Sequence, residues 1–83
     1  MNYSLTSPTI VPVIKESARN RPTTREIEAL TYISIGMDSK TTAKKMKISK
    51  RTVDFHLANV YTKLDANNRV QAINNARAKG YLN

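Results

Sequence analysis

The stretch "SKRTVDFHLANVYTKLD", residues 49–65, reads as one long helix with a strongly basic amino end. At about 100° per residue, most of its apolar side chains fall on one narrow stripe, as expected of a helix that packs on a core: Val53, Leu57, Val60, Tyr61 and Leu64. One large ring, Phe55, lies on the opposite side, and Asp54 lies on its flank. A helix over residues 50–64 would be roughly 22 Å long and would leave one face free for a partner.

The charge of the chain indicates which class of partner it binds. Among its 83 residues, 14 Lys and Arg stand against 6 Asp and Glu, which gives a formal net charge of +8. Six of these basic residues fall between Lys40 and Arg51, where no acid occurs. Because solubilising charge is usually mixed in sign, this cluster favours a polyanion, either nucleic acid or an anionic membrane surface.

The composition argues against an enzyme and against a metal site. Two glycines, one histidine and no cysteine provide no phosphate-binding loop, no His/Ser/Asp set and no thiolate ligands. The absence of cysteine is compatible with a reducing cytosol. The longest apolar run, residues 9–14, is interrupted by Pro12 and is too short to span a membrane. We therefore expect no cofactor and no membrane anchor.

Capping signals predict four helices after Pro22. Each helix begins after a residue whose side chain can accept from backbone N–H groups, and glycines end the first and the last: the caps are Thr23, Asp38, Ser49 and Asn68, and the glycines are Gly36 and Gly80. Thr23 and Glu26 together form a capping box. No alternating strand pattern occurs. The predicted fold is all-α, with a flexible arm or linker over residues 1–22 and a helical domain over residues 23–83.

The second and third predicted helices, joined by a tight turn at Lys47 and Ile48, have the arrangement of a helix-turn-helix DNA reader. From Thr23 to Gly80, 58 of the 83 residues, the sequence resembles the LuxR-type (GerE-like) helix-turn-helix family of bacterial transcription regulators. The matching segments are "TTREIEAL", "GMDSKTTA", "KISKRTVDFHLANVYTKL" and "NRVQAINNARAKG", and "TVDFHLAN" is most similar to the quorum-sensing branch.

The resemblance implies a four-helix domain, with the helix-turn-helix at about residues 39–64 and a dimerisation helix at about residues 68–79. It implies that the third helix enters the major groove of double-stranded DNA, and that a dimer binds an inverted-repeat site to activate or repress transcription. On the fourth helix, we expect the core side to be formed by Ala72, Ile73 and Ala76. The dimerisation strip would then consist of Val70, Asn74, Arg77 and Tyr81.

The predicted DNA-contacting residues come from the second helix, from the basic start of the third helix and from its exposed face: Lys40, Thr41, Lys44, Ser49, Lys50, Arg51, Thr52, Asp54, Phe55, Ala58, Asn59 and Lys63. A helix N-terminus beside cations suits a phosphate. The ring of Phe55 can pack on thymine methyl groups, and Asp54 can either accept from a cytosine amine or pair with Lys50 or Arg51. Asn59 could equally brace the helix or touch DNA.

Three residues depart from the family pattern. Pro22 stands where a leucine is usual, which removes an expected core contact. Thr42 stands where an aliphatic residue is usual, and the lost burial should cost about 1–2 kcal/mol. Lys47 fills the turn where no glycine is present, and we expect the backbone there to avoid positive φ.

The expected partners are double-stranded DNA, a second copy of the chain, and RNA polymerase or a related LuxR-type regulator. The primary hypothesis is a sequence-specific transcription regulator in the bacterial cytoplasm, associated with the nucleoid. The alternative is a stand-alone interaction module that heterodimerises with a full-length regulator of this type. Residues 1–22 are too few for the ligand-binding or phosphoacceptor domain that precedes this module in the family, so we expect binding without either signal. The sequence leaves open whether the chain is complete or an excised domain.

Overall fold

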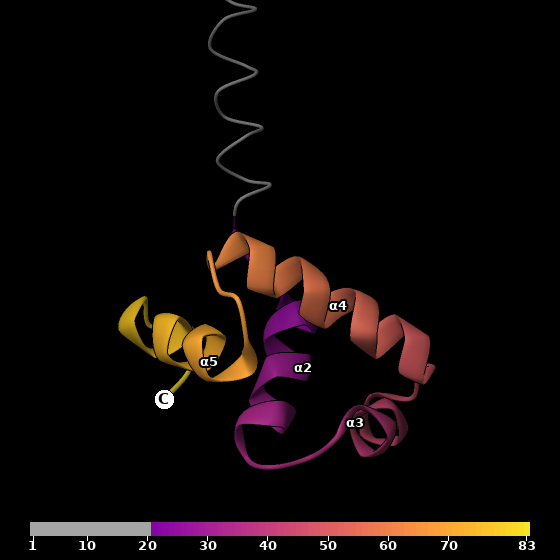
Figure 1. Ribbon diagram of the computed structural model, residues 1–83. Helices are drawn as coiled ribbons and strands as arrows, with labels where there is room; N and C mark the ends of the chain where they lie inside the picture. The colour runs from indigo at the N-terminus through magenta and orange to yellow at the C-terminus, as the bar shows by residue number, and fades with distance from the viewer. Residues whose placement is uncertain (1–20) are drawn as a thin grey trace, which may run out of the picture.

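The computed structural model describes residues 21–83, and most of the predicted arm, residues 1–20, lies outside the described residues. The described part contains four helices and no strand (Figure 1): α2 (Thr24–Ser34), α3 (Ser39–Met46), α4 (Lys50–Lys63) and α5 (Arg69–Ala78). The predicted all-α fold is confirmed. Between residues 21 and 83, no helix is long and apolar enough to cross a membrane.

The four predicted caps are all made. Thr23 Oγ1 accepts from the N–H of Glu26 at 3.1 Å, and Glu26 Oε1 accepts from the N–H of Thr23 at 3.0 Å, which completes the capping box. Three further side chains each accept from the N–H three residues later, at 2.8–3.0 Å: Asp38, Ser49 and Asn68. Because these contacts are local, each helix start follows from a few neighbouring residues.

The helices pack around one small core. α2 and α4 each contact all the other helices, whereas α3 and α5 lie at opposite ends and do not contact each other (Figure 1). The predicted stripe of α4 faces inward, with Tyr61 half-buried and the rest of the stripe buried. The buried apolar side chains are Ala29, Leu30, Ile33, Ala43, Met46, Val53, Leu57, Val60, Leu64, Ala72 and Ala76. As predicted, Ala72 and Ala76 of α5 face the core, while Ile73 is half-buried against it.

Two hydrogen bonds between helices fix the orientation of α3 and α5. The guanidinium of Arg25 at the start of α2 donates to the carbonyl of Met46 at the end of α3, at 3.0 Å. The side-chain amide of Asn75 on α5 donates to the carbonyl of Leu64, which follows α4, at 2.9 Å. Both bonds use carbonyls at helix C-termini, which have no partner within their own helix.

Lys47 connects α3 to α4 in a conformation that contradicts the sequence expectation. Its backbone is left-handed, with φ 60° and ψ 43°. The turn needs this geometry because the N–H of Ile48 donates back to the carbonyl of Ala43 at 3.0 Å, which closes α3 and reverses the chain. A residue with a side chain adopts this conformation at a cost of about 1 kcal/mol, and the charged side chain remains exposed.

Thr42 is fully buried among the helices, so the position does belong to the core. Its hydroxyl, Oγ1, is buried and has no hydrogen-bond partner within the described residues. A buried hydroxyl without a partner retains most of its desolvation penalty. The polar atom therefore weakens the core, which is small because the domain itself is small.

Replacing this hydroxyl by a methyl group should stabilise the domain. We expect Thr42→Val to raise the free energy of unfolding by about 1 kcal/mol, because the variant keeps the branched shape and removes the unpaired polar group. Urea denaturation followed by circular dichroism measures the change. Thr42→Ser is the matched control: it keeps the hydroxyl, loses the methyl group and should destabilise. A Thr42→Val variant no more stable than the parent protein would show that the hydroxyl is satisfied in solution.

Candidate nucleic-acid interface

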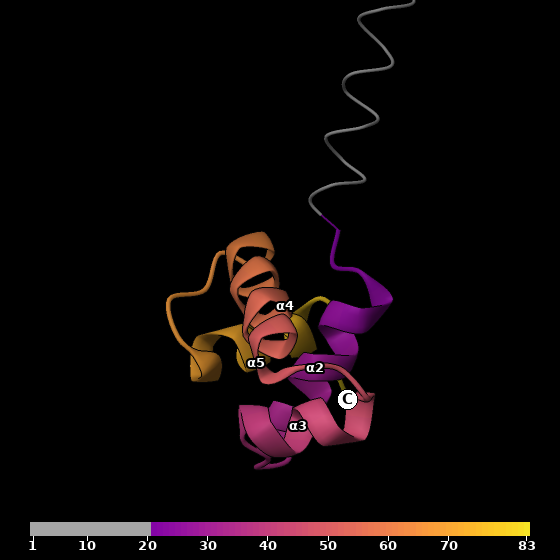
Figure 2. The same ribbon diagram turned by 90° about the vertical axis from the view of Figure 1, so that its right-hand side faces the viewer.

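α3 and α4 form a helix-turn-helix whose turn spans residues 47–49. α3 lies beside the amino-terminal end of α4, and α2 packs against both (Figures 1 and 2). This packing places the residues of α3 and the first turn of α4, which are neighbours in sequence, next to each other in space as well.

The amino end of α4 presents free backbone donors. Ser49 accepts from the N–H of Thr52 through its hydroxyl, at 3.0 Å, and from the N–H of Val53 through its carbonyl, at 3.1 Å. The N–H groups of Lys50 and Arg51 lie ahead of these bonds and remain available to a ligand. The positive end of the helix dipole adds to their attraction for an anion.

Exposed cations surround this helix end. All six basic residues of the cluster predicted from the sequence are exposed: Lys40, Lys44, Lys45, Lys47, Lys50 and Arg51. Thr41, also predicted to contact DNA, is exposed, while Thr52 is half-buried and its side-chain oxygen lies 2.9 Å from that of Ser49. Because α3 and α4 adjoin at the turn, these charges belong to neighbouring elements, and we call the six residues the basic surface.

Asp54 is held by its own helix. The ammonium of Lys50, one turn earlier, donates to Asp54 Oδ2 at 2.9 Å. This hydrogen bond, with a smaller contribution from the Ser39 side chain of α3, lowers the pKa of Asp54 below its usual range. Of the roles considered for Asp54, pairing with Lys50 is therefore the one that the structure contains.

The face of α4 that points away from the core carries the other predicted contact residues. Arg51, Phe55, Ala58 and Thr62 follow one another at helical spacing, all are exposed, and the Phe55 side chain is 63% exposed. Asn59 is half-buried at the edge of this face. An aromatic ring left this open on a rigid helix is available to a partner surface.

Lys63 has a different role from the one predicted. Its ammonium reaches across to α2 and donates to both carboxylate oxygens of Glu26, at 3.0 and 3.2 Å. The side chains of Lys63 and Glu26 are only 20% and 5% exposed. Lys63 therefore serves as the counter-charge of a buried acid, and we remove it from the DNA-contacting set.

Two contacts that hold α3 and α4 against α2 were not predicted from the sequence. Glu26 was recognised only as a local cap, and neither its pairing with Lys63 nor the bond from Arg25 to Met46 was foreseen. Local spacing cannot reveal contacts between residues 37 or 21 positions apart. One sequence signal was that Lys63 lies between Tyr61 and Leu64, two members of the core-facing stripe of α4.

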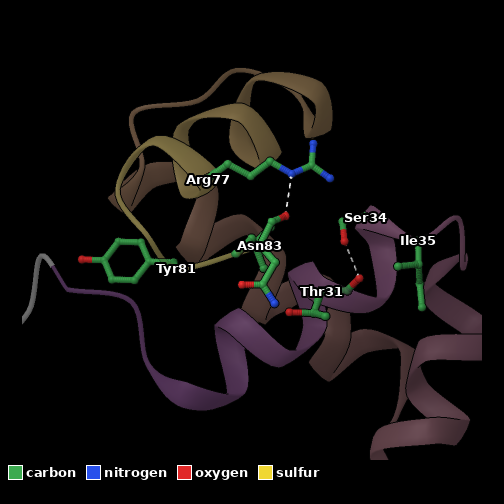
Figure 3. A pocket seen from close by; sticks show the side chains of 7 residues that line it. Thr31, Ser34, Ile35, Arg77, Tyr81 and Asn83 are labelled. Atoms are coloured by element: carbon green, nitrogen blue, oxygen red, sulfur yellow. Dashed lines mark hydrogen bonds between the residues drawn. The ribbon is translucent and has the colours of Figure 1, made fainter.

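The predicted dimerisation strip lies mainly on the exposed side of α5. Val70 is 64% exposed, and Asn74 and Arg77 are exposed, whereas Tyr81 is half-buried and packs against the core. The side chain of Arg77 donates to the carbonyl of Asn83 at 3.0 Å beside a pocket of about 290 Å³ (Figure 3). This pocket lies between the end of α2 and the residues that follow α5, and none of its lining residues belongs to α3 or α4.

Comparison with known proteins identifies the domain. The family of bacterial regulatory proteins called the luxR family, or GerE, matches residues 23–76. The chain belongs to this family. The LuxR resemblance inferred from the sequence is thereby confirmed, and DNA-binding transcription regulation is the function of this helix-turn-helix domain.

Individual relatives support the assignment of the chain to the LuxR family. The chain is 39% identical over 80 residues to the transcriptional activator protein SolR of Ralstonia solanacearum, covering 96% of this chain and 34% of SolR. It is 41% identical over 61 residues to the transcriptional activator protein VanR of Vibrio anguillarum, covering 74% of this chain and 25% of VanR. The chain thus spans about a third or less of the length of these relatives.

One solved structure shows the same LuxR-type fold. The phage VqmA–DPO complex matches with a TM-score of 0.66 and 25% sequence identity, over 98% of this chain and 38% of that chain.

Proposed function

We propose that this domain binds specific sites in double-stranded DNA by inserting α4 into the major groove. The observation that carries the proposal is the coincidence, at the start of α4, of free backbone N–H groups, the exposed cations Lys50 and Arg51, and an exposed face on the same helix. The basic end would hold the phosphate backbone and orient the helix, while the face would read base edges. The bacterial cytoplasm, where the nucleoid lies, is the proposed setting.

The proposal includes all residues of the predicted set except Lys63. Those expected to contact phosphates are Lys40, Thr41, Lys44, Ser49, Lys50, Arg51 and Thr52. Those expected to lie within the groove are Asp54, Phe55, Ala58 and Asn59. Arg51 lies where the two sets meet, so its side chain can reach either a phosphate or a guanine.

Selection of binding sites from random duplex DNA tests this function directly. The 83-residue protein should enrich a palindromic sequence whose half-sites are separated by one helical turn, because a two-fold dimer requires matching half-sites. Lys50→Ala/Arg51→Ala should abolish the enrichment and leave the helical content unchanged. Enrichment of no sequence by the folded protein would overturn sequence-specific binding and favour the alternative module that pairs with a related regulator.

We propose that DNA completes a dimer through the exposed strip of α5. The strip is small and mostly polar: Val70, Asn74, Arg77 and part of Tyr81. Such a strip buries little apolar area and should hold free subunits together only weakly. Adjacent half-sites would then bring two subunits together by mass action.

A charge placed in this strip should weaken cooperative binding. We expect Val70→Arg to reduce the joint occupation of two half-sites roughly tenfold, because two like charges would meet across the two-fold axis. Gel-shift titration on one-half-site and two-half-site duplexes measures the effect. Thr24→Arg adds the same charge on α2 and should leave cooperativity intact. If Val70→Arg bound two half-sites as cooperatively as the parent protein, the dimer interface would lie elsewhere.

A further inference from the structure

The exposed face of α4 combines one cation, Arg51, with side chains that are largely apolar. Beyond Arg51, its residues Phe55, Ala58 and Thr62 follow at helical spacing and cover, with Arg51, about 16 Å of the helix. We call these three residues the apolar stripe. Phe55, the largest of the three, is 63% exposed to solvent.

Two polar side chains in and beside the apolar stripe, those of Thr62 and Asp54, already make hydrogen bonds within the protein. The hydroxyl of Thr62 donates to the carbonyl of Ala58 at 3.1 Å, so its proton points toward the helix backbone and is not free to donate to a base. The carboxylate of Asp54 accepts from Lys50 at 2.9 Å. A hydrogen bond from a cytosine amine would compete with this ion pair.

Among base edges in the major groove, only thymine carries an apolar group, its 5-methyl; the other features are hydrogen-bond donors and acceptors. Packing an apolar stripe against those donors and acceptors would cost binding free energy, because they would lose water without gaining a hydrogen-bond partner. Packing the stripe against a methyl group is favourable, because it removes apolar surface of both partners from water. We propose that α4 recognises its site chiefly through pyrimidine 5-methyl groups packed against Phe55 and its neighbours. This inference rests on the proposed insertion of α4 into the major groove.

The charge around the apolar stripe favours a nucleic acid over a protein as its occupant. The stripe continues directly into the exposed cations Lys50 and Arg51, and the cluster of six basic residues lies at the same end of the helix. An aromatic surface beside so concentrated a positive field complements the groove of a polyanion.

Replacing thymine by uracil in the selected site tests the proposal, because uracil differs from thymine only by lacking the 5-methyl group. Each thymine of the site is replaced in turn, and the dissociation constant is measured at fixed salt. At one or two positions in each half-site, the loss of the methyl group should weaken binding about fourfold, the effect of uncovering one methyl-sized group. Replacements outside the contacted positions should have no effect.

Two further comparisons assign the effect to the apolar stripe. Phe55→Ala should bind more weakly and should no longer distinguish thymine from uracil at the position that its ring covers. Ile35→Ala is the matched control: Ile35 is 66% exposed but follows α2, so its loss should leave the uracil effect unchanged. A third duplex carries cytosine in place of a thymine at which uracil weakens binding. Methylating this cytosine at its 5 position should recover part of the lost affinity, because it restores the methyl group.

The outcomes separate this inference from the function on which it rests. If no sequence is enriched, the proposed function fails, and the inference fails with it. If a sequence is enriched but no uracil replacement weakens binding, methyl recognition is overturned while sequence-specific binding stands. If uracil matters equally for the parent protein and for Phe55→Ala, the methyl groups are read by other residues, and the assignment to Phe55 is overturned.

Discussion

Raising the salt concentration from 50 to 200 mM should weaken binding of a dimer to its DNA site about 10⁴-fold. Each subunit presents about four cations to the phosphate backbone, from Lys40, Lys44, Lys50 and Arg51, all of which are exposed. Each neutralised phosphate releases counterions, so about eight contacts per dimer predict a log–log slope near −7. Fluorescence anisotropy titrations over a series of salt concentrations measure this slope.

Single substitutions assign parts of this salt dependence. Arg51→Ala should reduce the slope by about 2 units per dimer and weaken all sequences alike if its side chain holds a phosphate. If Arg51 instead reads a guanine, the variant should lose preference at one base pair and keep most of the slope. Lys79→Ala, which removes an exposed charge after α5, is the control and should change neither quantity. Salt-independent binding would contradict the assignment of the basic surface.

Removing the carboxylate of Glu26 should destabilise the domain by about 3 kcal/mol. The substitution Glu26→Ala leaves the ammonium of Lys63 only 20% exposed and without its partner, and it also removes half of the capping box. A domain of this size has a total stability on the order of 5 kcal/mol, so much of the folded population would be lost near physiological temperature. Chemical denaturation of both proteins provides the measurement.

A double-mutant cycle separates the ion pair from the cap. Glu26→Gln keeps an oxygen that can accept from the N–H of Thr23, so its cost reports mainly the lost charge. Lys63→Met leaves the carboxylate buried without its counter-ion and should also destabilise. The double variant should be more stable than the sum of the two single losses predicts, because neither charge remains unpaired. Purely additive losses would show that the two side chains do not interact in solution.

The LuxR-type helix-turn-helix was predictable because its signals are local. Thr23, Asp38, Ser49 and Asn68 each cap a helix through a contact three residues away, and the core-facing stripe of α4 repeats at the helical period. The same period placed Phe55 on the exposed face, and the Ser49 cap placed Lys50 and Arg51 at the start of the helix. These features depend only on which residues are neighbours on one helix, and the sequence contains that information.

Tertiary structure decided the features that depend on how separate helices meet. Lys63 was predicted to contact DNA, but the crossing of α2 and α4 brings its ammonium to Glu26, 37 residues away. Lys47 takes a left-handed backbone, against expectation, because the chain must reverse there to lay α4 across α3. In each case the outcome depends on a distance or a direction that the packing of the helices sets. Residue type and spacing along one helix do not determine that distance or direction.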